Sequence, residues 1–459
     1  MNNSKKGLAL SMVLILGLIL TIMGFAFLYL SREERSFSHK NIYPASAFWI
    51  AEAGAEHGKA WLEKELPPNN WKNPYRYGEP FQPFEEQQFD IGKYSVTITP
   101  PSIYNPGGYL IDSVGSVDVP TEKGTKTITK KIKINATVRT FARFAYYSNN
   151  ETRPGGDTIW FTDNDILYGP IHSNSRINIR GKPTFHGRVT STASSFNYYS
   201  GVNNNPQFNA GYKLGAREIS MNEMVNMQDL KDAAIDEGIY INVDKTLNPS
   251  VPVTLNGHTV TYSYVEKYMD GKKEKTRTVT RSFTIDTFGV IYSTNNLDIQ
   301  GPLINNKLTD AKVHDHLTIA TEGDMLIKTK VLYNTLPNNP SCTGMLGLVA
   351  SNSIKVASDA PKNMEIHATI MSFNDSFSVE NYNSGSSKGT LTIWGGIIQQ
   401  YRGAVGTFNS KTGAQLTGYV KNYHYDERVT AQPPPVFPLI KINPEDPYYR
   451  IDSWEELSS

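Results

Sequence analysis

A phrase of thirteen residues occurs twice in this chain, at two widely separated places. GPIHSNSRINIRG runs from Gly169 to Gly181, and GVIYSTNNLDIQG runs from Gly289 to Gly301. Each copy has the pattern of a short strand, a polar Ser/Asn turn and a second short strand. Such strands bury their apolar side chains only by stacking on neighbouring copies. The repeated phrase therefore predicts a parallel β-helix, with each copy lying in one turn of it, which we call a rung.

The aligned positions of the two copies indicate which side chains face the inside of a rung. The pairs are Gly169/Gly289, Ile171/Ile291, Ser173/Ser293, Ile179/Ile299 and Gly181/Gly301. A third, shorter copy, GLVASNSIKV, begins at Gly347 and aligns Ser351 with the two serines. We expect the isoleucines to point inward and the Ser and Asn residues to lie in turns, where their side chains bond to the backbone.

We expect this β-rich head to span residues 150–432, with an insertion at about residues 200–285. Within the insertion, Ile219–Gly238 has the pattern of a helix with a glycine stop. Two hairpins are expected after it, around Asn256-Gly257 and Asp270-Gly271. A β-sandwich with recurring hairpins is the alternative fold for the head.

An uncharged run at the N-terminus predicts a membrane span. The 23 residues from Leu8 to Leu30 carry no charge. As a helix they reach about 35 Å, enough for a hydrocarbon core of about 30 Å. The run is longer than the apolar part of a secretory signal, and the charged SREER follows it, so we expect the span to be retained. Lys5 and Lys6 favour a cytoplasmic N-terminus, although Arg32 and Arg35 weaken this bias.

The helical pattern continues beyond the span. Phe48, Ala51, Ala55 and Leu62 recur at spacings of three, four and seven, which places them on one helical face. We expect a helix over residues 8–65, apolar in its first half and amphipathic in its second. Pro44 is predicted to kink or interrupt it.

These N-terminal residues resemble the corresponding region of PilX-type minor pilins. The leader MNNSKKG, the run GLALSMVLILGLILTIMG and the phrase AFWIAEAGAEHG carry the likeness. The resemblance implies that residues 1–7 are a leader, which a prepilin peptidase removes between Gly7 and Leu8. It also implies that the helix packs into a filament through the segment that contains Phe48, Ala51 and Glu52. Major pilins have a Glu at the fifth mature position. In this chain Met12 occupies that position, which favours a minor component over a bulk subunit.

Two further regions complete the predicted organisation of the chain. From Gly92 the apolar period changes to two, and three or four antiparallel strands are expected within residues 66–149, which is also the pilin layout. Residues 433–459 read as a Pro-rich tail, in which PPPVFP packs along the body as a clamp or end-cap. The section Phe141–Pro438 resembles an uncharacterised bacterial domain family that is often found downstream of PilX-type N-termini. That likeness implies no catalytic residues.

Few residues point to chemistry. Parallel β-helices can host polysaccharide lyases and hydrolases, and the candidate groups for such chemistry are Asp163, Asp165, His172, His186 and His314–His316. A glycosidase needs two carboxylates about 5–10 Å apart, but the segment TDND favours a turn. His314 and His316 share a strand face, yet no third metal ligand is identifiable. Cys342 is the single cysteine of the chain, which excludes an intramolecular disulfide. We expect no catalytic residue, no metal site and no cofactor.

The sequence predicts a non-catalytic, pilin-like minor component of a type IV pilus or a related secretion filament, acting in assembly priming or at the tip. Its expected partners are other pilin subunits, the inner-membrane assembly machinery, the prepilin peptidase and membrane lipid. A surface or glycan ligand of the head remains open. The nearly balanced charge, 45 Lys plus Arg against 44 Asp plus Glu, offers no argument for nucleic acid.

The expected location is the bacterial inner membrane, crossed once with the N-terminus in the cytoplasm, and afterwards the cell surface or a filament. The alternative function is that of a membrane-anchored adhesin or a glycan-processing β-helix protein. Leader cleavage and presence in sheared filaments separate the two.

Overall fold

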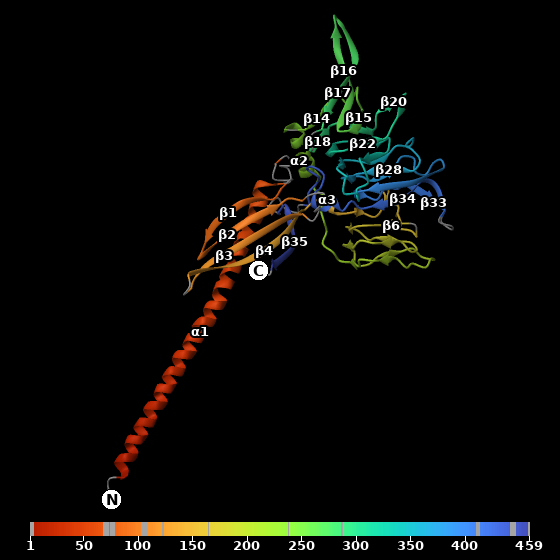
Figure 1. Cartoon of the computed structure of the whole chain (residues 1–459). Coiled ribbons are helices and arrows are strands. Elements are labelled where there is room, and N and C mark those ends of the chain that lie inside the picture. Colours follow the sequence, from red (N-terminus) through yellow and green to blue (C-terminus); the bar gives the residue numbers. More distant parts are fainter. Residues whose placement is uncertain are drawn as a thin grey trace.

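A computed structural model describes most of the chain. The described residues are 4–67, 73, 79–101, 108–121, 124–163, 165–236, 238–285, 288–409, 414–440 and 447–457, with the backbone alone at 4–9, 32–41 and 288. They form a long N-terminal helix, a small antiparallel sheet wrapped on its second half, and a parallel β-helix head (Figure 1). The predicted fold class is confirmed, and the alternative of a β-sandwich is wrong.

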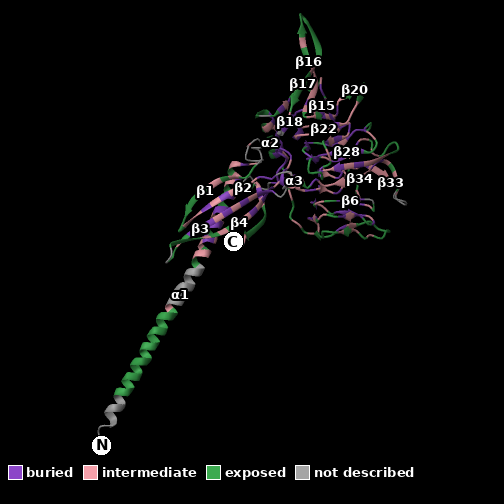
Figure 2. Ribbon diagram, in the orientation of Figure 1, coloured by how far each residue is buried: buried purple, intermediate pink, exposed green. Residues whose placement is uncertain are grey.

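Helix α1 (Ser4–Glu65) runs without interruption through both the predicted span and the amphipathic segment. Pro44 lies inside it, so the predicted interruption of the helix at this residue is wrong. A proline removes one intrahelical hydrogen bond, but Ala47 and Ile50, directly after it, are buried against the antiparallel sheet. We infer that this packing holds the second half of the helix in line with the first. Figure 2 shows the change from an exposed to a buried helix along α1.

Five antiparallel strands cover the second half of α1, and we call them the collar sheet. In spatial order they are β1 (Phe81–Phe89), β2 (Gly92–Thr99), β3 (Tyr109–Thr121), β4 (Gly124–Val138) and β35 (Tyr449–Leu457). The sequence predicted β2, β3 and β4 but neither β1 nor β35. The last strand comes from the region assigned to a Pro-rich tail, and it pairs along the C-terminal half of β4.

Glycines bring α1 and the collar sheet close together. A Cβ on Gly115 of β3 would lie 2.3 Å from the carbonyl oxygen of Ala47, and one on Gly54 would lie 2.4 Å from Ser113 Oγ. Gly58 likewise faces Ile111 and Val96 at contact distance. Larger residues at these positions would push the helix away from the sheet. The glycines thus allow the second half of α1 and the collar sheet to form one core.

The head is a β-helix with three short strands in most of its described rungs. One face is a parallel sheet in the spatial order β13 (Tyr212–Lys213), β10 (Val189–Ser191), β7 (Ile171–Ser173), β5 (Tyr146–Asn150), β32 (Ile397–Tyr401), β29 (Thr369–Ser372), β26 (Met345–Ala350), β23 (His316–Thr321), β18 (Phe288–Ser293) and β14 (Ile239–Ile241). A second face contains β15 (Ser250–Gly257), β19 (Asn296–Gln300), β24 (Met325–Ile327), β27 (Ile354–Val356) and β30 (Phe377–Val379).

The third face continues from β15, which pairs with both β19 and β22. Its strands are β22 (Ala311–Val313), β25 (Val331–Tyr333), β28 (Met364–His367), β31 (Ser387–Trp394), β34 (Gln415–His424), β6 (Ile166–Leu167), β9 (Thr184–Phe185) and β12 (Gln207–Phe208). Shorter elements at the edges are β8 (Asn178–Ile179), β11 (Asn197–Tyr198), β20 (Leu303–Ile304), β21 (Lys307–Leu308) and β33 (Gly406–Phe408).

The rungs do not stack in the order of the sequence. The chain enters the β-helix in its middle, at β5, and builds outward through β7 and β10 to β13. Helix α2 (Glu223–Asp236) then leads to β14 at the opposite end, and the later rungs return until β32 pairs with β5. We call this contact between the first rung and the last the seam. Because β5 belongs to the head, the boundary lies before Tyr146 and not at residue 150.

The predicted insertion at 200–285 is partly built into the β-helix. Its helix is confirmed as α2, and both hairpins occur where the sequence placed them. However, β14 and β15 are strands of the β-helix, because each pairs in parallel with strands of the next rung. Only the hairpin of β16 (Thr259–Asp270) and β17 (Lys273–Thr284) extends away from the head (Figure 1).

An internal column of apolar side chains confirms the rung interpretation of the repeated phrase. From β14 to β10, nine of the ten strands of this sheet, the residues in register are Ile239, Ile291, Ile319, Leu348, Ile370, Ile397, Tyr146, Ile171 and Val189. Ile171 and Ile291 thus occupy equivalent positions, and both are buried. Ile179 and Ile299 are also buried, on the next face of their rungs.

The alignment of the third copy is wrong by one residue. Ser293 is in register with Thr321 and then with Ala350, so Ser351 lies one position beyond the column of Ser173 and Ser293. Gly347 is in register with Thr318, whereas Gly289 is in register with Leu317 and, one rung further, with Leu346. A Cβ there would lie 2.8 Å from the Phe437 ring, so this glycine makes room for the Pro-rich segment.

The other repeated glycines serve different purposes in the two copies. Gly169 and Gly181 have φ of 86° and 79°, a left-handed backbone that favours glycine. A Cβ at Gly301 would instead lie 2.3 Å from the carbonyl oxygen of Thr309, so lack of space explains that glycine. Gly289 packs more loosely, with Ile285 at 3.0 Å from such a Cβ.

The Pro-rich segment covers the outer surface of the ten-stranded sheet. Phe437 is buried there, and Thr318 Oγ1 donates a hydrogen bond of 2.5 Å to the carbonyl oxygen of Pro435. Leu230 of α2 and Val429 of α3 (Arg428–Ala431) belong to the same apolar cluster. The segment therefore packs along the body as the sequence predicted.

Candidate functional site

The first half of α1 exposes a continuous apolar surface. Leu10–Ser31, 22 residues, is long and apolar enough to cross a membrane, and none of these residues is buried. Phenylalanines 25 and 27 are among the most exposed side chains in this stretch. A surface of this kind is stable only inside a bilayer or against another protein. The structure describes only the backbone at Gly7 and Leu8, so cleavage between them stays a prediction.

The second half of α1 packs differently from the prediction of a filament-facing surface. Ala51 is buried beneath β3, where Ser113 Oγ donates 2.7 Å to its carbonyl oxygen. Glu52 Oε2 accepts a 3.1 Å hydrogen bond from Trp454 Nε1 of β35, and the Phe48 ring lies edge-on to the same indole. Phe48, Ala51 and Glu52 therefore make these contacts within one chain, because the collar sheet covers this face of α1.

The face of α1 turned away from the collar sheet carries two large apolar side chains. Ile42 is 52% exposed and Trp49 is 65% exposed, and their spacing of seven places them on the same face. Sequence reasoning missed this face because it followed the apolar period. Trp49, an apolar residue that departs from that period, was the signal in the sequence for a second apolar face.

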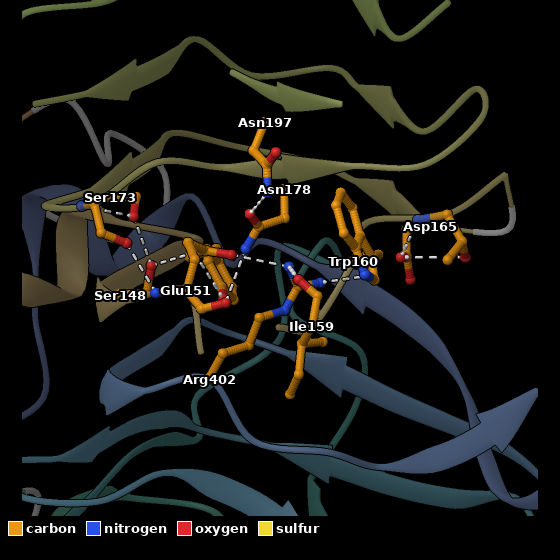
Figure 3. A network of polar contacts seen from close by, with 12 residues as sticks. Ser148, Glu151, Ile159, Trp160, Asp165, Ser173, Asn178, Asn197 and Arg402 are labelled. Carbon is orange, nitrogen blue, oxygen red and sulfur yellow. Dashed lines mark hydrogen bonds and ion pairs between the residues drawn. The ribbon is translucent and has the colours of Figure 1, made fainter. Parts of the chain in front are cut away.

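A buried ion pair joins the two rungs at the seam (Figure 3). Arg402 Nη1 lies 2.9 Å from Glu151 Oε2, and the two side chains are 3% and 1% exposed. The same guanidinium donates to the carbonyl oxygens of Ile159 and Trp160 at 3.2 and 3.3 Å. Asn178 Nδ2 donates 2.9 Å to the carbonyl oxygen of Glu151.

The charges at the seam hold the guanidinium in its ionised form. Burial by itself lowers the pKa of Arg402, but the neighbouring Tyr146, Glu151 and Asp165 raise it above its ordinary value. The Arg402 guanidinium also lies 3.6 Å above the centre of the Phe161 ring. Since these groups are sealed from solvent, the arrangement joins β5 to β32 and is suited to structure and not to substrate binding.

The two aspartates considered for catalysis belong to a turn, as the sequence favoured. Asp165 Oδ2 accepts 2.7 Å from the backbone N–H of Thr162, and Asp165 Oδ1 pairs with Lys421 Nζ at 3.0 Å. Asp163 Oδ1 accepts 2.7 Å from the backbone N–H of Lys182. Both carboxylates thus have structural hydrogen bonds that position the next rung.

The candidate histidines are separated from one another. His172 is buried, with Nδ1 at 2.8 Å from Thr190 Oγ1 and Nε2 at 2.9 Å from Asn174 Oδ1, and burial lowers its pKa. Burial also lowers the pKa of His316 to about 3. His314 lies beside His258 instead, with ring centres 5.1 Å apart. Within the described ranges, no group of three His, Cys, Asp or Glu side chains is placed to hold a metal ion.

A row of aromatic rings follows the outer side of the third face of the β-helix. Trp394 and His424 stack with ring centres 4.4 Å apart, His424 and Tyr168 at 5.6 Å, and Tyr168 and His186 at 4.4 Å. We call these four residues the aromatic row. It borders a pocket of about 440 Å³ that is also lined by Asn338 and other polar residues of two loops.

The described residues define a β-helix protein whose body is built directly onto a helix long enough to cross a membrane. A family model described as "Domain of unknown function (DUF4900)" matches residues 109–194. The matched stretch begins with β3 and β4 of the collar sheet and continues through the rungs of β5, β7 and β10. No curated protein and no solved structure matches the chain.

Proposed function

We propose that this protein is a non-catalytic, pilin-like component of a type IV pilus or a related secretion filament, acting in assembly priming or at the tip. One observation carries the proposal. Helix α1 is continuous from its exposed apolar half into the core of the collar sheet. Together with the likeness to PilX-type minor pilins, this favours a subunit that is anchored in the inner membrane and then passes into a filament.

The close packing of α1 supports a subunit that moves as one piece. Ala51, Gly54 and Gly58 let the helix lie directly on the sheet, so a displacement of the apolar half is passed to the collar without a linker. A tethered enzyme has no need for such a rigid connection. The bulk of the β-helix head (Figure 1) makes close lateral repetition along a filament shaft sterically difficult, which favours the tip.

Processing of the leader tests this function. We expect the mature chain to begin at Leu8, and a Gly7→Phe variant to remain uncut, because a bulky side chain at the cleavage position obstructs the peptidase. N-terminal sequencing and immunoblots of sheared filaments provide the measurement. The processed protein should be found in the filament fraction, and Gly7→Phe should be absent from it. Ser4→Ala, a change in the same leader, is the control and should behave as wild type. A mature protein that begins at Met1 or near Leu30, or equal filament content in Gly7→Phe, contradicts the proposal.

A second candidate function, attachment of the head to a glycan, is favoured by the aromatic row. Sugars bind proteins through aromatic rings together with amide and carboxylate groups, and Trp394, His424 and Tyr168 border a pocket lined by Asn338 and Glu427. In this role the protein is an adhesin, whether it stays in the membrane or enters a filament.

Retention on insoluble polysaccharides tests the second function. Full-length protein in detergent should sediment with at least one of cellulose, chitin or peptidoglycan. Trp394→Ala should weaken this retention by about tenfold or more, equivalent to ~1.4 kcal/mol. Tyr198→Ala, an exposed tyrosine on β11 outside the aromatic row, should have no effect. Retention on none of the three polymers, or equal losses for both variants, rules out the aromatic row as the binding surface.

A further inference from the structure

A cleft of about 1060 Å³ lies between the collar sheet and the head. Helix α1, β4 and β35 line one side, and β7, β10 and β13 line the other. The cleft is separate from the seam, the aromatic row and the exposed half of α1. Its size is at the upper end of pockets that bind small organic molecules.

The charged groups of the cleft are unbalanced. Its described lining contains the cations Lys59, Arg139, Arg143, Lys213, Arg217 and Arg450 and the carboxylates Glu56, Glu63 and Glu218. Two of the carboxylates already have partners. Glu56 pairs with Lys59 at 2.8 Å, and Glu63 accepts 2.8 Å hydrogen bonds from the backbone N–H groups of Tyr448 and Tyr449. Within the described lining, Glu218 remains to neutralise the arginines, and Asp452 beside the cleft pairs with Arg450.

Arg143 carries the strongest indication that the cleft suits an anion. No hydrogen bond or ion pair of its guanidinium occurs among the residues that the structure describes. Burial, and then repulsion by Arg450, lowers the pKa of Arg143 to about 10, although Asp452 and Tyr425 act in the opposite direction. A cation that is both desolvated and repelled costs stability unless an anion binds to it.

Arg450 supplies a second, independent observation. It forms an ion pair with Asp452, yet its Nε atom is buried without a hydrogen-bond partner. Among the described residues, the Arg139 guanidinium makes one long contact of 3.4 Å, from Nη1 to the carbonyl oxygen of Pro447. Three guanidinium groups thus line one cleft with unused or weakly used donors.

We propose that this cleft binds a small organic oxyanion, a carboxylate or a phosphate attached to an apolar body. Guanidinium groups match the planar, bidentate geometry of both oxyanions. Phe144, Ile219 and Ile440 supply apolar walls for the remainder of the ligand. Because the lining comes from both units, the bound ligand ties the collar sheet to the head. The proposal is independent of the assignment to a filament.

Calorimetry and thermal unfolding of the full-length protein in detergent, at low ionic strength, test the site. The probes are inorganic phosphate, phenyl phosphate and benzoate, which separate phosphate from carboxylate recognition and show the contribution of the apolar body. We expect saturable 1:1 binding of phenyl phosphate or benzoate, a higher melting temperature on binding, and weaker binding as salt is added. Arg143→Gln should reduce the affinity at least about tenfold, and Arg143→Lys should restore part of it.

The matched control is Arg188→Gln, an exposed arginine of the head outside the cleft, which should bind as wild type does. Without ligand, Arg143→Gln should melt at the same temperature as Arg188→Gln or higher, because repulsion by Arg450 and Arg139 is relieved. Binding of none of the probes, or equal binding by Arg143→Gln and Arg188→Gln, overturns the proposal. A melting temperature of ligand-free Arg143→Gln clearly below that of Arg188→Gln assigns Arg143 a structural role and also overturns it.

Discussion

Arg402→Ala is expected to destabilise the head by about 3–5 kcal/mol, because it leaves the Glu151 carboxylate buried without its partner. The side chains of both residues are almost completely buried, and the guanidinium also holds the carbonyl oxygens of Ile159 and Trp160. Chemical unfolding of the full-length protein in detergent, followed by tryptophan fluorescence, measures the change. Amide hydrogen exchange should show the earliest opening at β5 and β32, which meet at the seam.

Two further variants separate the seam from a general effect of losing an arginine. Arg153→Ala removes a partly exposed ion pair with Asp157 and a hydrogen bond to the Tyr382 hydroxyl, and should cost no more than about 1 kcal/mol. Replacing both partners, Glu151→Leu with Arg402→Met, should recover part of the loss, because no unpaired charge remains buried. If Arg402→Ala costs no more than Arg153→Ala, the ion pair does not hold the seam together.

Ile299→Ala and Ile179→Ala should each cost roughly 2–5 kcal/mol, the usual range for a buried isoleucine. Both side chains are 0% exposed and lie in the interior of the β-helix, so truncation leaves a cavity between rungs. The same denaturation experiment measures both variants. Leu303→Ala in the small hairpin of β20 is the control, because that side chain is 63% exposed and its loss should change stability little. An unchanged midpoint for either isoleucine variant contradicts the equivalence of the two copies.

The two predictions differ in whether their residues could be identified from the sequence. Ile179 and Ile299 could be identified from the sequence, because a repeated phrase with an apolar residue at a constant position indicates a repeated burial site. The partnership of Glu151 with Arg402 could not, since the two residues are far apart in the chain and neither belongs to a repeat. It exists because the rungs stack in an order that differs from the sequence.

The incorrect predictions share a physical cause. Phe48, Ala51, Ala55 and Leu62 were predicted to share one helical face, but the apolar period does not say whether another subunit or the same chain covers that face; packing of Phe48, Ala51 and Glu52 in a filament stays a prediction. Pro44 signals a break in an isolated helix, and tertiary packing outweighs that local preference. Ser351 was misaligned by one residue because a short copy contains too few distinctive positions to set the register.

The sequence by itself determined the local structure of this protein: the apolar helix, the amphipathic segment, the strands β2 to β4, both hairpins, α2 and the existence of rungs. Each of these depends on periodicity, turn residues or repetition within a few neighbouring positions. Only the tertiary structure decided the addition of β35 to the collar sheet, the entry of the chain at β5 and the buried charges at the seam. It also decided the cleft in which Arg143, Arg139 and Arg450 meet. These features depend on which distant segments bury one another, and many pairings of short apolar strands are compatible with the same local pattern.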